Sequence, residues 1–177
     1  MIRQLVNPKT EKYLQIKDWI LTSSYFPWYY KKDSTPKADR IKDHVDISFF
    51  SHVFLDRAEY NGYPVSYSSK VQEVVDVFRE IMVHNYIHPI TFLRLNANLV
   101  YPYPTVVNTL PHFDHHFKHK NIIIYLTGTG GNTIVEGEVH EPQEDDVIIF
   151  EGEHYHQTPV SGRRVVLVAT FIDEEML

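Results

Sequence analysis

Residues 146–172 read DVIIFEGEHYHQTPVSGRRVVLVATFI. Two runs rich in β-branched residues, 146–150 and 163–172, flank a polar segment that carries the turn signals Glu151-Gly152 and Ser161-Gly162. Short apolar runs bounded by such turn residues are typical of buried strands. The stretch therefore predicts two strands joined by a loop that contains two histidines.

Three more strand-like segments lie on the N-terminal side of this stretch, at 90–101, 121–126 and 132–139. The first of them alternates: one face carries Leu93, Leu95, Ala97 and Leu99, and the other carries Arg94, Asn96 and Asn98. Turn-forming residues at 127–131 and 141–142 separate the segments. Short strands at this spacing predict an antiparallel sandwich or barrel.

The N-terminal half has a different pattern. Residues 9–21 and about 69–84 have the apolar spacing of amphipathic helices, and Ser68 or Ser69 could cap the second one. Residues 22–66 are rich in aromatic and turn residues and predict irregular structure with short strands, including HVDISFFSHVFL at 44–55. We therefore expect a single domain over 1–177, in which a helical and irregular part (1–89) packs on a β core (90–173).

Length and composition restrict the class of protein. The chain has 177 residues, 43% of them hydrophobic and 23% charged, as in a globular domain with one core. No segment approaches the roughly 18 apolar residues of a membrane helix, and the N-terminus has no signal-peptide core, so we expect a cytoplasmic protein that does not bind membranes. A net charge of -6 without a basic block argues against nucleic acid as an obligatory partner.

The chain has no cysteine but 11 histidines. A metal site must therefore use histidine nitrogen and carboxylate oxygen, which suit iron, manganese, zinc or nickel. Because alternate residues of an extended segment point to the same side, His112 and Asp114 should converge. His154 or His156 could complete a two-histidine-one-carboxylate face with open positions, as in non-haem iron(II) oxygenases. These two histidines have the same parity, so the residues alone leave the choice between them open.

Three segments in this order resemble the 2-oxoglutarate/iron(II) oxygenase family: PHFDHHFKHKNIIIYL, GGNTIV and DVIIFEGEHYHQTPVSGRRVVLVATF. The last is most similar to small prolyl-hydroxylase-like and phage-encoded members. The resemblance covers roughly residues 90–173. It implies a mainly β fold with N-terminal helices, built on a double-stranded β-helix (a cupin-like jelly roll).

The resemblance also implies roles for single residues. Three would be the iron ligands and catalytic centre: His112, Asp114 and His156. His156 is preferred to His154 because Tyr-His after the Phe-x-Gly turn matches the family better. Arg164 would bind the distal carboxylate of 2-oxoglutarate by two charge-assisted hydrogen bonds; Arg163 points to the opposite face of its strand. Tyr125 would contact the same carboxylate, and Asn98 would be a further cosubstrate contact.

The activity so implied is hydroxylation of a C–H bond with Fe(II), 2-oxoglutarate and O2, and Asp114 favours hydroxylation over halogenation. The substrate would be a small molecule or a peptide or protein, such as a peptidyl proline. The alternative is a non-catalytic cupin-like metal-binding or sensor module, which would leave Arg164 unexplained. A metal-dependent isomerase or hydrolase on the same core is a third reading.

Overall fold

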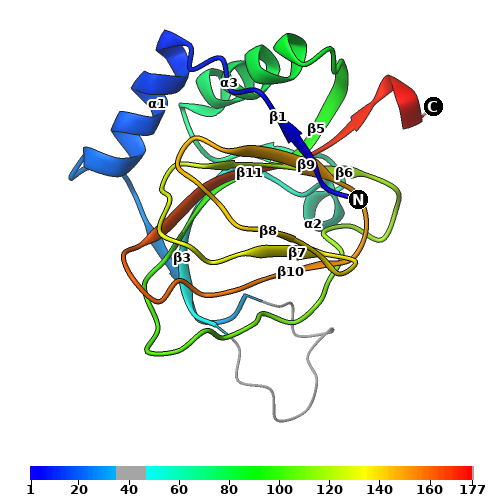
Figure 1. Cartoon of the computed structure of the whole chain (residues 1–177). Coiled ribbons are helices and arrows are strands. Elements are labelled where there is room, and N and C mark those ends of the chain that lie inside the picture. Colours follow the sequence, from blue (N-terminus) through cyan, green and yellow to red (C-terminus); the bar gives the residue numbers. More distant parts are fainter. Residues whose placement is uncertain (35–46, 177) are drawn as a thin grey trace.

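The computed structural model describes residues 1–34 and 47–176, and Figure 1 shows helices above a large sheet with a small sheet below it. In chain order the elements are β1 (Arg3–Leu5), α1 (Glu11–Thr22), β2 (Tyr29–Lys31), β3 (Phe49–Asp56), α2 (Ala58–Asn61), β4 (Val65–Ser66), α3 (Val71–His84), β5 (Pro89–Val100), β6 (Lys120–Tyr125), β7 (Thr133–Val135), β8 (Glu138–His140), β9 (Val147–Phe150), β10 (His154–His156), β11 (Arg164–Asp173) and a 3-10 turn, η2 (Glu174–Met176).

The large sheet is antiparallel and runs in the order β1-β9-β6-β11-β5-β3-β2, with β4 paired to β3. Its centre is β11, where Leu167 lies opposite Ala97 of β5 and Ile124 of β6. The alternation of Leu95, Ala97 and Leu99 on β5 therefore continues across the sheet and gives it one apolar face. A register shift at Leu93 interrupts the pattern, so that Phe92 packs in this core in place of the predicted Leu93. Strands β1 to β4 come from the N-terminal part of the chain, so that part supplies edge strands as well as helices.

Helices α1 and α3 cover the apolar face, and they lie where the sequence predicts helices. They bury one stripe each, formed by Tyr13, Ile16 and Ile20 on α1 and by Val74, Val77, Phe78, Ile81 and Met82 on α3. Neither candidate serine caps α3: its N-cap is Lys70, whose backbone N–H donates to Ser68 Oγ. No helix in the described ranges is long and apolar enough to cross a membrane.

Ion pairs and a hydrogen bond to Asp145 connect α1 and the residues before it to the turn before β9. The carboxylate pairs with Lys9 Nζ at 2.8 Å and with Lys17 Nζ, and it accepts a hydrogen bond from the Tyr13 hydroxyl. Burial alone would raise the pKa of Asp145, but the hydrogen bonds from Lys17, Lys9 and Tyr13 lower it to about 2. The ionised carboxylate thus stabilises the contact between helix and sheet.

The opposite face of the large sheet packs on the small sheet, whose order is β10-β7-β8. Here Ile123, Tyr125 and Val166 contact Val135 of β7. The prediction of one strand over 132–139 is wrong, because β7 and β8 form a hairpin. Its turn, Glu136-Gly137, has φ values of 49° and 89°, the left-handed geometry of a tight two-residue hairpin.

The strand predicted within 44–55 begins later than expected. Strand β3 starts at Phe49, and residues 44–46 of the predicted segment lie outside the described residues. Strand β10, by contrast, falls in a polar segment in which we predicted a loop.

Candidate functional site

A cavity of about 320 Å³ is lined by residues from both sheets, chiefly from β3, β5, β6, β9, β10 and β11, and by the segment that precedes β6. The inward faces of the strands supply its walls, because alternate residues of a strand point to the same side. Among the residues predicted for the site, five line this cavity: Asn98, His112, Asp114, His156 and Arg164.

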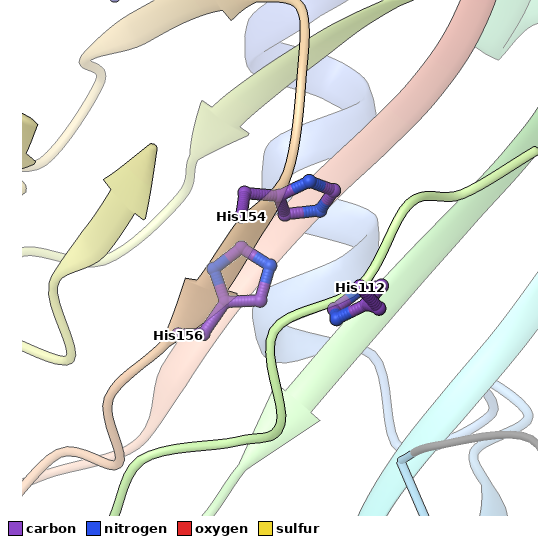
Figure 2. A group of neighbouring side chains, drawn as sticks. All are labelled: His112, His154 and His156. Carbon is purple, nitrogen blue, oxygen red and sulfur yellow. The ribbon is translucent and has the colours of Figure 1, made fainter. Parts of the chain in front are cut away.

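Three histidines converge in the cavity. His112 and His154 form an antiparallel bridge with backbone hydrogen bonds of 2.9 and 3.1 Å, and His156 follows two residues later on the same side of β10. One ring nitrogen of each lies within 4.8 Å of the others. Figure 2 shows the two β10 histidines extending from one strand and His112 from the segment facing it.

Hydrogen bonds to Nδ1 fix how these rings are oriented. Nδ1 of His112 lies 2.9 Å from the Leu110 carbonyl oxygen, and Nδ1 of His154 lies 3.3 Å from the Gly152 carbonyl oxygen. Each of these Nδ1 atoms must carry the proton, so that the lone pair of the neutral ring is on Nε2. Burial lowers the pKa of His154 to about 4 and that of His156 well below its usual value. Neutral imidazoles are the form that binds a metal.

Asp114 is ionised beside this group. Burial would raise the pKa of its carboxyl, but Arg94, the neighbouring histidines and Arg57 hold it well below its usual range. Oδ1 accepts hydrogen bonds from Arg94 at 2.6 Å and from Arg57 at 2.9 Å. Oδ2 lies 3.6 Å from Nε2 of His154. Both arginines thus donate to Oδ1, and Oδ2 remains available on the side that faces the histidines.

Arg164 lies at another end of the cavity and is 4% exposed. Its Nε donates to the Gly131 carbonyl oxygen at 3.0 Å, and its guanidinium lies over the Tyr125 ring, 5.4 Å from the centroid. Arg164 forms no ion pair with a carboxylate of the described residues, so a buried cation is left without a counter-charge. Arg163 is exposed and donates to the Leu21 carbonyl oxygen, away from the cavity.

The Gly-Gly turn before β7 makes room for this arginine. Gly131 has φ +82°, and a Cβ there would lie 2.6 Å from Cδ of Arg164. Gly130 also has positive φ, but a Cβ at that position would meet open space. Only the second glycine is therefore required by the approach of Arg164.

A hydroxyl joins the arginine end of the cavity to the histidines. Thr133 Oγ1 lies 2.6 Å from the Tyr125 hydroxyl, 3.0 Å from Nδ1 of His156 and 3.4 Å from Nη2 of Arg164. Tyr125 is fully buried, and burial raises its pKa, so it remains a protonated hydrogen-bonding group. Tyr125 thus reaches the site through Thr133 and Arg164.

The sequence did not identify every residue of the site. Asn98, which was predicted to contact the cosubstrate, lines the cavity and accepts a hydrogen bond from Asn96 at 2.7 Å. Arg94 shares their strand face, and this alternation is a signal that could have marked it. Arg57 had no such signal, because its place depends on the approach of a distant segment. Thr133 lies in the GGNTIV segment that carries the family resemblance, but no role was assigned to it.

The donor set fits a divalent transition metal. Three imidazoles and a neighbouring carboxylate are ligands that iron(II), zinc and manganese accept, and no thiolate is available. These donors share the cavity with the buried guanidinium of Arg164, which has no carboxylate partner in the part of the chain that the structure describes. The arrangement is suited to a metal and an anionic small molecule bound side by side.

No family model matches the sequence, and no curated protein matches it either. Solved structures do match. An oxidoreductase of the 2OG-Fe(II) oxygenase family from Burkholderia pseudomallei has TM-score 0.60 and 16% identity, over 91% of this chain and 79% of its own. A prolyl hydroxylase from Trichoplax adhaerens, solved with a hypoxia inducible factor peptide fragment, has TM-score 0.59 and 11% identity, over 99% and 84%. An alpha-ketoglutarate-dependent epimerase from nogalamycin biosynthesis has TM-score 0.56 and 11% identity, over 97% and 77%.

These likenesses show the fold. The chain has the mainly β, antiparallel architecture of 2OG-Fe(II) oxygenases, as the sequence resemblance predicted. Hydroxylases and an epimerase share this architecture, so the reaction of this chain has to be argued from its own site.

Proposed function

We propose that the protein is a 2-oxoglutarate- and Fe(II)-dependent dioxygenase that hydroxylates a C–H bond, and that its two sheets form a double-stranded β-helix. The observation that carries the proposal is the content of one cavity. Three histidines and Asp114 offer ligands for a metal, and Arg164 offers a buried cation for the distal carboxylate of 2-oxoglutarate.

His112 and Asp114 would supply two of the three metal ligands, and β10 would supply the third. The family pattern favours His156, whereas the 3.6 Å contact with Asp114 favours His154. Substituting each in turn with alanine decides between them. The variant that loses the ligand should lose iron, as measured by bound metal per chain, and the other should retain it.

When bound, iron with 2-oxoglutarate and O2 would supply the oxidising chemistry. The chain supplies binding and orientation. Arg164 would hold the distal carboxylate of the cosubstrate through two parallel hydrogen bonds, as planar guanidinium groups do. Tyr125 and Asn98 would add polar contacts, and Arg57 and Arg94 keep the Asp114 carboxylate ionised and oriented.

A peptidyl residue such as proline is a candidate substrate. The support is the likeness to the Trichoplax adhaerens prolyl hydroxylase, which was solved with a peptide fragment. A panel of proline peptides, free amino acids and other small molecules, assayed for succinate release, tests this part of the proposal. Release with a free amino acid but with no peptide would reject the peptidyl substrate.

Anaerobic titration of the protein with Fe(II) and then 2-oxoglutarate tests the class of enzyme. We expect a visible metal-to-ligand charge-transfer band that appears only when both are present. A folded protein that binds iron but gives no band with 2-oxoglutarate would be a metal-binding module, and the proposal would be rejected.

A further inference from the structure

The wall of the cavity contains a polar side chain that has no hydrogen-bond partner among the described residues. Asn121 is 1% exposed, and both its Nδ2 and its Oδ1 are buried without a hydrogen bond. It lines the same cavity as Asp114 and His154. A buried amide that forms neither kind of hydrogen bond destabilises the fold, so its position calls for a ligand that supplies both.

Asn121 faces the cavity because of its position on β6. It has the parity of Ile123 and Tyr125, which pack toward the small sheet. It lies opposite Phe150 on β9 and Thr170 on β11. Because β6 is paired on both sides, Asn121 is fixed in the wall of the cavity. The lining residues next to it, Ile123 and Phe150, are apolar.

Asn121 also lies far from the arginine end of the cavity. Its partner Thr170 is six residues from Arg164 along β11, or about 20 Å at 3.3 Å per residue. The ring of Phe150 packs against His154, with centroids 4.9 Å apart, whereas His156 connects through Thr133 to Arg164. Of the two β10 histidines, His154 thus lies nearer Phe150 and His156 nearer Arg164, and Asn121 belongs to the end of the cavity away from the cosubstrate anchor.

We propose that Asn121 binds an amide group of the substrate. A primary amide donates and accepts at once, and its complement is a group that does the same: another carboxamide, or the backbone N–H and C=O of one extended residue, which point to the same side. The apolar side chains beside it would pack on the aliphatic part of the same substrate. This proposal rests on the proposed function and narrows its substrate class to compounds that contain a peptide or carboxamide group.

The first test measures the stability of the metal-free protein. Asn121→Leu removes two unpartnered polar atoms, so its Tm should equal that of the wild type or exceed it by a few degrees. The matched control is Asn85→Leu. Asn85 is fully bonded to the backbone of Val6 and Ile81, and its loss should lower Tm by several degrees. A fall in the Tm of Asn121→Leu as large as that of the control would make Asn121 a structural residue and overturn the proposal.

The second test uses two small probes with the ¹⁵N-labelled protein loaded with Zn(II) and 2-oxoglutarate. N-acetylprolinamide has an amide that donates and accepts, and N-acetylpyrrolidine has only a carbonyl. We expect the side-chain NH2 signals of Asn121, identified by their loss in Asn121→Leu, to shift with N-acetylprolinamide. N-acetylpyrrolidine should bind about tenfold more weakly, as should N-acetylprolinamide to Asn121→Leu.

Three results would overturn the proposal. They are a shift of the Asn121 signals with 2-oxoglutarate alone, equal affinity of the wild type for both probes, and no binding of N-acetylprolinamide to the wild type. The affinity for 2-oxoglutarate should change by less than twofold in Asn121→Leu. The charge-transfer band of the wild type, measured separately, reports on the proposed function, so that failure of one proposal is distinguishable from failure of the other.

Discussion

Replacing Arg164 with methionine removes the buried guanidinium and keeps an unbranched apolar stem in its place. The bound cosubstrate would lose two charge-assisted hydrogen bonds, which contribute about 1.5–3 kcal/mol each. Water can partly solvate the carboxylate in the variant, so we take the lower end of the range, about 3 kcal/mol in total. At about 1.4 kcal/mol per factor of ten, the Kd for 2-oxoglutarate should rise about 100-fold.

The assay is the anaerobic charge-transfer titration, with Arg163→Met as the matched control. Arg163 is the next residue but is exposed and donates only to the Leu21 carbonyl oxygen, so its loss should change the Kd by less than twofold. The metal-free Arg164→Met protein should unfold within a few degrees of the wild type, because no ion pair is lost. A Kd for Arg164→Met within threefold of the wild type would refute the assignment of Arg164 to the cosubstrate.

Three further predictions concern other parts of the structure. Gly130→Ala should cost about 1–2 kcal/mol of stability because of its positive φ. Gly131→Ala should cost more, because its Cβ would also lie 2.8 Å from the Gln157 carbonyl oxygen. Only Gly131→Ala should weaken 2-oxoglutarate binding, by more than tenfold in the same titration, because its Cβ meets Arg164; equal binding by both would contradict this. The pKa of Asp145 is about 2 in the folded protein and 3.8 ordinarily. The ionised carboxylate should therefore stabilise the folded protein above about pH 4, and this stabilisation should be lost as the pH falls toward 2. In urea unfolding, Asp145→Asn should be about 2 kcal/mol less stable than the wild type at pH 7 and nearly equal to it at pH 2. Asp114→Ala should fold, as judged by circular dichroism, yet show no 2-oxoglutarate turnover, and metal-dependent turnover in that variant would remove Asp114 from the site.

Much of the fold was predictable because its strands have strong local signals. The alternation of β5 and the apolar runs of β6, β9 and β11 depend on burial, which sequence patterns report directly. Strand β10 is three residues of a polar segment, and it is a strand only because β7 lies beside it. The β7–β8 hairpin was predicted as one strand because Glu136-Gly137 is a short turn inside a run of β-forming residues.

The candidate site likewise contains residues that have a local signal in the sequence and residues that have none. His112, Asp114 and Arg164 were predictable because spacing and motif order place them near one another. Arg57 reaches Asp114 from 57 residues away, and the missing partners of Asn121 can be recognised only when its surroundings are known. Such long-range pairings leave no local pattern in a single sequence.

The hydroxyl of Thr133 imposes a direction on its hydrogen bonds, because it has one proton and two lone pairs. Arg164 can only donate a hydrogen bond, so its bond to Thr133 uses one of the two lone pairs of the Thr133 hydroxyl. When Nε2 of His156 faces a metal, Nδ1 carries the proton and donates it to the second lone pair of the Thr133 hydroxyl. Thr133 must then donate to Tyr125, whose own proton is left for another acceptor, and a carboxylate beside Arg164 is such an acceptor. Metal and dicarboxylate should therefore bind cooperatively, each raising the affinity for the other by the same factor, and Thr133→Val should weaken that coupling.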